Sequence, residues 1–263
     1  MAEAVEAGGG LAMPSIRRVE LERPWSWLAS GWRDFRRAPA VGLAYGLLFG
    51  GAGALITFAL WRIGWWYLIL PMTSGFLIMG PILAVGLYET SRRLEHGQPV
   101  GLAEAIAAYR INAGQIALMG VALMLFFFFW VRIAAVIFMG FFGLHPPSPE
   151  HFFSEVFFAP ESIPFVVVGF GVGGVFALFA FAMSVVSIPL LLDRSEANVV
   201  TAIVTSFRAV SENPGAMLLW AALIVVFVGF GLVTFYLGLV ATLPLIGFAS
   251  WHVYRDVVDR DAR

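Results

Sequence analysis

Six stretches of this 263-residue sequence are apolar over roughly 20 residues each, the length that an α-helix needs to cross the hydrocarbon core of a bilayer. They lie at residues 39–61, 65–87, 113–132, 163–192, 214–234 and 236–254. Arg132 is the only Asp, Glu or Arg within them. With 60% hydrophobic and 13% charged residues, the chain is too apolar for an ordinary soluble domain. We therefore expect an all-α, polytopic membrane protein with six transmembrane helices.

The spacing of the apolar stretches predicts three helical hairpins. The first two stretches are nearly fused, as are the last two, so each pair must turn back within a few residues. The third and fourth are joined by a longer loop. The expected organisation is a disordered cytoplasmic N-terminus at residues 1–23, a membrane domain at 24–257 and a cytoplasmic tail at 258–263.

The positions of the arginines predict the orientation. Arginines precede the first span and follow the second, fourth and last spans, whereas residues 144–162 contain none. By the positive-inside rule, both termini are expected in the cytoplasm. The near-neutral net charge of −1 gives no indication of nucleic-acid binding. Membrane lipids are the expected partners, and another membrane protein complex is a further candidate partner.

Three segments before the hairpins carry apolar residues at helical spacing, which is typical of helices that lie in the membrane interface. The apolar stripes are Trp25, Leu28, Trp32 and Phe35; Leu102, Ala105, Ile106 and Tyr109; and Val199, Ile203, Phe207 and Val210. Each segment also carries an aromatic residue followed by arginine, and a proline followed by two aliphatic residues recurs in the second span of each hairpin. This pattern predicts a pseudo-threefold repeat of interfacial helix, span and span.

Prolines and glycines in the spans allow two interpretations. The prolines are either kinks that neighbouring helices tolerate or breaks that line a substrate site. The candidates for such a site are Pro71, Pro81, Pro189 and Pro244, with Thr73, Ser74, Ser184, Ser187 and Thr242 nearby. Two glycine stripes favour close helix packing: Gly42, Gly46, Gly50 and Gly53, and Gly169, Gly171, Gly173 and Gly174.

Two groups of charged residues are candidate functional positions. The first lies where spans end in the cytoplasm and consists of Glu89, Arg92, Asp193, Arg194, His252 and Arg255. It is either a set of salt bridges that closes the bundle or a cytoplasmic ligand site. The second is Arg132, which is expected near the outer boundary of its span. It is either an interfacial anchor beside Trp130 or a cation that contacts an anionic headgroup or substrate.

The segment between the third and fourth spans predicts a short amphipathic helix on the outer leaflet, with Phe152, Phe153, Val156 and Phe157 on one face. Its alternative roles are a lid or a docking surface. The nearby histidines and carboxylates match no metal-ligand spacing. The chain has no cysteine, which excludes disulfides, thiolate catalysis and cysteine-bound iron–sulfur clusters. We expect no metal, no cofactor and no catalytic residues.

Several short segments resemble a known family. They are Gly75–Pro81, Gly86–Glu89, Ser91–Arg93, Leu192–Arg194 and Trp251–Arg255. Gly86–Glu89 and Trp251–Arg255 are the most specific of these segments. Together they resemble the bacterial integral membrane family called domain of unknown function 2189, over about residues 25–255. The resemblance implies a bacterial inner membrane and brings no agreed catalytic residues.

Some members of that family are labelled cytochrome c oxidase subunit I, which implies at most an association with respiration. A haem–copper subunit needs histidines within its spans. The four histidines here, His96, His145, His151 and His252, lie in loops or at membrane edges. The label therefore cannot mean catalysis by this chain.

Three hypotheses for the function follow. The first is a non-enzymatic accessory or scaffold protein, favoured by spans that are nearly free of charge. The second is a transporter or channel for a small neutral or lipid-like substrate, favoured by the repeat and the proline-containing spans. The third is an enzyme of lipid metabolism that uses Glu89, Asp193 or His252, which no motif of nucleophile and base supports.

Overall fold

The computed structural model describes residues 13–65, 68–143, 152 and 154–259, and this part of the chain is helical. The helices are α1 (Arg23–Arg37), α2 (Pro39–Arg62), α3 (Ile69–Leu83), α4 (Val85–Glu95), α5 (Leu102–Ala107), η2 (Ala108–Arg110), α6 (Ala113–Phe142), η3 (Ser154–Phe158), η4 (Pro160–Ser162), α7 (Ile163–Ser184), α8 (Ser187–Asp193), α9 (Val199–Glu212), α10 (Pro214–Val233) and α11 (Leu239–Val257).

Five helical segments of the described chain are long and apolar enough to cross a membrane, where six were expected. They are Pro39–Arg62, Ile69–Glu95, Ala113–Phe142, Pro160–Asp193 and Pro214–Val233. The third is longer than expected, since α6 continues ten residues beyond Arg132. The expected sixth span forms α11, whose last turns contain His252, Arg255 and Asp256 and are therefore less apolar.

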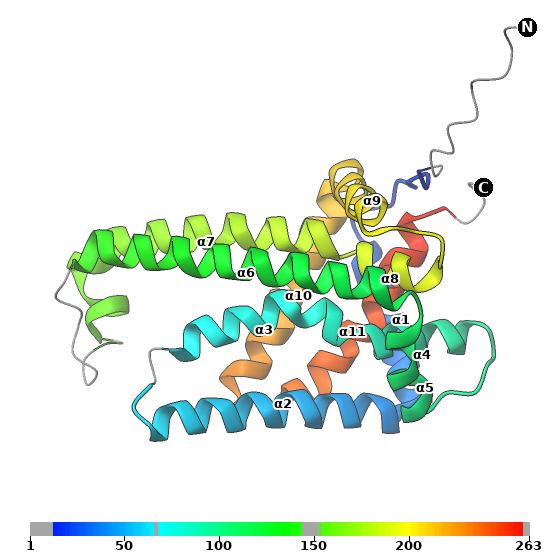
Figure 1. The fold of residues 1–263 in the computed structure, drawn as a ribbon, viewed down its shortest axis with the longest axis horizontal. Helices are drawn as coiled ribbons and strands as arrows, with labels where there is room; N and C mark the ends of the chain where they lie inside the picture. Colours follow the sequence, from blue (N-terminus) through cyan, green and yellow to red (C-terminus); the bar gives the residue numbers. More distant parts are fainter. Residues whose placement is uncertain (1–12, 66–67, 144–151, 153, 260–263) are drawn as a thin grey trace, which may run out of the picture.

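Helix α11 is the centre of the bundle. It packs against α1, α2, α4 and α10, and large side chains such as Phe248, Trp251 and Tyr254 are almost fully buried along it. Because protein surrounds this helix, its polar residues find partners inside the fold. Figure 1 shows α2, α6 and α7 running the length of the molecule, while α1, α4, α5, α8 and α9 gather at one end. We call this end the polar end.

Two of the spans are broken near proline. Pro81 precedes the break between α3 and α4, and Pro189 follows the break between α7 and α8. Side chains from short helices satisfy backbone groups at both breaks. The hydroxyl of Tyr109 donates to the carbonyl of Leu83 at 2.8 Å. The backbone N–H of Val186 donates to Oγ of Ser206 at 3.1 Å. These breaks are thus tolerated by packing, as membrane helices require.

The two glycine stripes behave differently. On α2, a side chain at Gly46 would collide with the backbone of Val240, and one at Gly53 would meet the ring of Tyr236 at 2.7 Å. The first stripe therefore permits the close approach of α2 and the start of α11. On α7, a side chain added at Gly169, Gly171 or Gly174 would meet no described atom within 4 Å beyond the backbone of its own helix. The expected packing role is thus found for the first stripe but not for most of the second.

Residues 13–22, which belong to the stretch 1–23 that the sequence predicted to be disordered, form defined hydrogen bonds with the rest of the described chain. Its backbone pairs with the C-terminal end of the chain: Arg17 N–H donates to Val257 at 2.8 Å, and Asp259 N–H donates to Ser15 at 3.0 Å. Val19 N–H donates to Oδ1 of Asn213 at 2.8 Å. We call residues 13–22 the N-terminal strap, because they lie across the ends of α10 and α11.

Candidate functional site

A network of buried polar side chains joins α1, α4 and α11 at the polar end. The Oδ2 atom of Asp34 accepts a hydrogen bond from Oγ of Ser91 at 2.8 Å and lies 2.7 Å from Nε2 of His252. Asp34 is 6% exposed and Ser91 is 1% exposed. A buried carboxylate is costly unless it is paired. Here one carboxylate oxygen holds three helices together.

The composition of this trio suggests a hydrolase triad, but its order is different. In such a triad the imidazole lies between the serine and the carboxylate, so that it can remove the serine proton. In this protein the carboxylate of Asp34 lies in the middle, and the hydroxyl of Ser91 donates to it. In the described structure, Ser91 donates to Asp34 and to the carbonyl of Phe248, and it forms no hydrogen bond to an imidazole. The arrangement is suited to holding helices, not to nucleophilic attack.

Glu89 forms a second group on α4. Its side chain is 1% exposed and lies 2.7 Å from Nε of both Arg92 and Arg93. Arg92 also donates through a second guanidinium nitrogen at 3.1 Å. The two arginines follow Glu89 by three and four residues, so all three lie on one face of the helix. Both oxygens of this buried carboxylate are engaged.

Arg255 links a third group across α4, α8 and α11. Its guanidinium lies 3.1 Å from Glu95 and 3.4 Å from Asp193. Tyr254 donates its hydroxyl proton to Asp193 at 2.7 Å, and Trp251 donates its indole N–H to Glu95 at 3.1 Å. The ends of these three helices are therefore joined by charge-assisted hydrogen bonds, which are stronger than neutral ones.

The charge cluster expected from the sequence is thus divided in the structure. Glu89 and Arg92 form one pair, and Asp193 and Arg255 another. His252 bonds to Asp34. Arg194 instead donates to the backbone carbonyl of Asp259 at 2.7 Å. The residues meet at one end of the bundle, but not as one ring.

Sequence reasoning missed Asp34, Ser91 and Glu95. For Asp34 a signal existed: it follows Trp27 by seven residues, so it lies on the buried side of α1. An acid on that side must find a partner inside the fold. For Ser91 and Glu95, no local pattern in the sequence separates them from ordinary polar residues at a helix end.

Arg132 lies inside α6, and the helix continues beyond it. Ten further residues reach Phe142, which corresponds to about 15 Å of helix. Its side chain is exposed. Trp130, two residues earlier, packs on Phe176 of α7 with ring centroids 5.2 Å apart. The contact of Arg132 with an anion stays a prediction.

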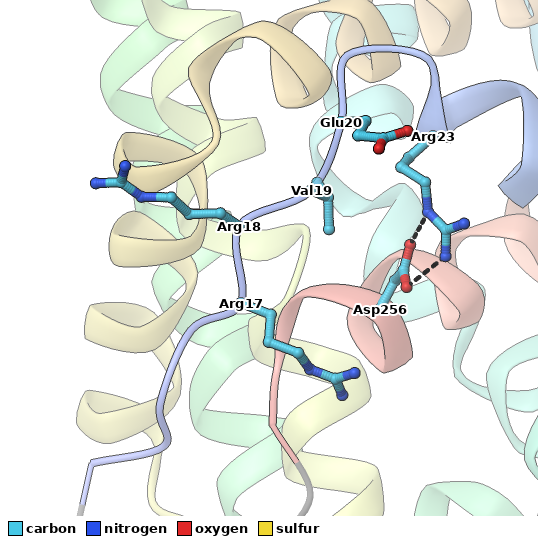
Figure 2. Close-up of a pocket in the computed structure, with 6 residues that line it drawn as sticks. All are labelled: Arg17, Arg18, Val19, Glu20, Arg23 and Asp256. Atoms are coloured by element: carbon cyan, nitrogen blue, oxygen red, sulfur yellow. Dashed lines mark hydrogen bonds and ion pairs between the residues drawn. The ribbon is translucent and has the colours of Figure 1, made fainter.

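A shallow hollow of about 280 Å³ lies beside the N-terminal strap. Figure 2 shows the residues that line it. It is lined by Arg17, Arg18, Val19, Glu20, Arg23 and Asp256. Arg23 is already engaged, since it donates two hydrogen bonds of 2.7 Å to Asp256. Arg17 and Arg18 point in different directions. The hollow therefore does not focus its arginines on one ligand.

The pair formed by Arg23 and Asp256 shifts the titration of both groups. Burial acts to raise the pKa of the Asp256 carboxyl, but hydrogen bonds from Arg23 and Trp27 and the charge of Arg23 outweigh it, so that this pKa lies below its usual value. The hydrogen bond to Asp256 and its negative charge raise the pKa of Arg23. Asp256 is therefore ionised at neutral pH.

Among the described residues, no group of three His, Asp or Glu side chains could hold a metal ion. His96 lies exposed after α4, with Nδ1 2.7 Å from the carbonyl of Arg92. His145 and His151 lie outside the described residues. Phe153 of the expected outer helix also lies outside the described residues. The rest of that segment forms η3, in which Val156 is buried.

Residues 69–193 match a known family. It is the family described as "Predicted integral membrane protein (DUF2189)". The expected resemblance to DUF2189 is therefore confirmed over α3 to α8, and the chain is a multi-pass helical membrane protein. This part includes Glu89, Arg92 and Asp193, whereas Asp34 and His252 lie outside it. No curated protein and no solved structure matches the chain.

Proposed function

We propose that this protein is a non-enzymatic scaffold or accessory protein of a bacterial inner membrane. The observation that carries the proposal is the self-contained polar end: the carboxylates of Asp34, Glu89 and Asp193 are all bonded to side chains of the same chain. Groups that act on a substrate need a free face toward it. These groups instead hold helix ends in place.

The exposed faces of the spans support the same proposal. In the most apolar 18-residue part of each helix, 6% of the residues of α6 and 17% of those of α2 are buried inside the protein. Exposed side chains such as Leu55, Leu125 and Val225 project from three different spans. Lipid covers such faces, and small or branched residues on them also allow another helix to pack. A scaffold requires surface of this kind.

The proposed topology has six membrane helices, with α11 as the sixth and both termini in the cytoplasm. The packing of the short helices supports a pseudo-threefold repeat, because α5 packs on α4, α9 on α8 and α1 on α11. Helices α5 and α9 thus each contact the end of the hairpin that precedes them. Helix α1 contacts the end of the last hairpin, so that the three units are joined in a circle. Exposed apolar pairs on α5 and α9, Leu102 with Ile106 and Val200 with Val204, support an interfacial position.

Transport is the weaker candidate. It was favoured by the proline-containing spans, but the breaks in these spans are filled by Tyr109 and Ser206 of the same chain. In transporters, the backbone groups freed at such breaks bind the substrate or ion. The structure engages them in packing.

The scaffold proposal is tested by purifying the tagged protein from its native membrane in lipid nanodiscs and identifying bound proteins. We expect a stoichiometric partner, and a respiratory complex is the first one to seek. Tryptophan introduced at Leu55, Leu125, Val175 or Val225, which are exposed on α2, α6, α7 and α10, should displace a partner helix at one position but not at all four.

Lipid adapts to an added ring, whereas a packed helix does not, so the positions that still bind the partner serve as matched controls for the one that does not. Recovery of the protein without any stoichiometric partner, in the wild type and in all four variants, would overturn the scaffold role.

A further inference from the structure

Helix α1 has two apolar sides, of which the protein itself covers one. Trp27, Leu28 and Phe35 are buried against the bundle, and Gly31 is pressed so closely on α11 that a side chain there would meet the backbone of Ala249 at 2.7 Å. Trp25 and Trp32 lie on the other side, 56% and 46% exposed. They are seven residues apart and therefore share one face.

Exposed arginines adjoin these two tryptophans. Arg33, Arg36 and Arg37 are exposed in the last turns of α1. Arg33 donates to Ser30 of the same helix at 2.8 Å, and Arg36 and Arg37 form no hydrogen bond or ion pair with described residues. The one acid of α1, Asp34, is buried and bonded on the opposite side. The exposed face therefore combines indole rings with uncompensated positive charge.

The position of this face identifies what covers it. Ala38 alone separates α1 from α2, which begins at Pro39 and is a candidate span. The arginines thus lie where the chain enters the bilayer, at the depth of the lipid headgroups. Tryptophan is enriched at that depth, and arginine there is attracted to anionic lipid.

We propose that the exposed face of α1 binds anionic phospholipid, with Trp25 and Trp32 inserted at the headgroup level and Arg36 and Arg37, together with Arg33, bound to lipid phosphates. This face is a lipid-binding surface that the scaffold role does not require. It would exist whether or not the protein has a protein partner.

The lipid preference is tested by reconstituting the protein with phosphatidylglycerol and phosphatidylcholine and measuring which lipid it retains, by native mass spectrometry. Each arginine near an anionic surface contributes about fivefold. The variant R36Q/R37Q should therefore lose about thirtyfold of the preference for phosphatidylglycerol. The matched control R17Q/R18Q removes the same charge from exposed positions on the N-terminal strap, away from any span, and should retain the preference. Equal losses in both variants would overturn the proposal.

The depth of the face is tested separately, using the absence of cysteine from the chain. A spin label on Trp32→Cys should be relaxed by oxygen dissolved in the bilayer and shielded from a water-soluble relaxing agent. A label on Gln98→Cys, exposed in the turn after α4, should show the reverse. A label at position 32 that is as open to water as one at position 98 would overturn the proposal. So would a protein partner captured in native membranes by a photoreactive benzophenone reagent attached to the same cysteine at position 32.

Discussion

Asp34 connects α1 to two other helices, because one carboxylate oxygen contacts both α4 and α11. We expect Asp34→Ala to lower the free energy of unfolding by about 3 kcal/mol, since Ser91 and His252 both lose their bond to its carboxylate. Ser91→Ala should cost about 1 kcal/mol, because a single hydrogen bond is lost. Thermal unfolding in detergent measures both, with Glu20→Ala as an exposed control. Equal midpoints for D34A and E20A would contradict the assigned role.

At the residue scale, the sequence predicted that charges gather at one end of the bundle but not how they pair. Glu89, Asp193 and Arg255 were identifiable because each follows a long apolar stretch. The pairing of His252 with Asp34 was not identifiable, because the two residues are 218 positions apart and their contact depends on how α1 crosses α11. Pairing between distant side chains is a property of tertiary packing, which local patterns do not contain.

At the element scale, two glycines of α2 provide a matched comparison. Gly46→Ala should destabilise the protein by about 1–3 kcal/mol, because the added methyl group meets the backbone of Val240 and forces α2 and α11 apart. At Gly51, five residues later, an added methyl group would meet no described atom within 4 Å beyond the backbone of its own helix. Gly51→Ala should therefore be neutral or slightly stabilising. Unfolding midpoints compare the two variants directly. A destabilisation by G51A as large as that by G46A would show that the contact with Val240 is not what distinguishes the two positions.

The elements themselves were largely predictable. Five of the expected apolar stretches are candidate spans, since length and hydropathy are direct requirements of the bilayer. The sixth stretch forms α11, which is less apolar than the other spans because its last turns contain His252, Arg255 and Asp256. The end of α6 at Phe142 was missed for a related reason: Arg132 was interpreted as a boundary, although an exposed arginine can lie within a helix.

At the scale of the whole molecule, the two ends of the described chain are held together by the strap and by the pair formed by Arg23 and Asp256. The pKa of Asp256 is lowered by folding, so its contribution to stability is present above the unfolded pKa of about 4 and is lost as the pH falls through the folded value. We expect D256N to remove this part of the acid sensitivity.

The measurement is the difference in unfolding midpoint between wild type and D256N over a series of pH values. The difference should be greatest at neutral pH and should shrink on acidification below about pH 4. Glu22→Gln removes a nearby exposed acid and should leave the wild-type profile unchanged. Parallel profiles for wild type and D256N would show that this ion pair does not stabilise the fold.

The close packing of α1 on α11 also governs the order in which the molecule can be completed. The ribosome makes Asp34 218 residues before its partner His252, so Asp34 must wait for this partner until the spans between them have been synthesised, and Trp27 must wait likewise for Asp256. Hairpins can form from neighbouring segments as they emerge. The contact between α1 and α11 instead joins the first and the last of the described helices, and it is slow to form for that reason. Assembly therefore finishes with the first helix.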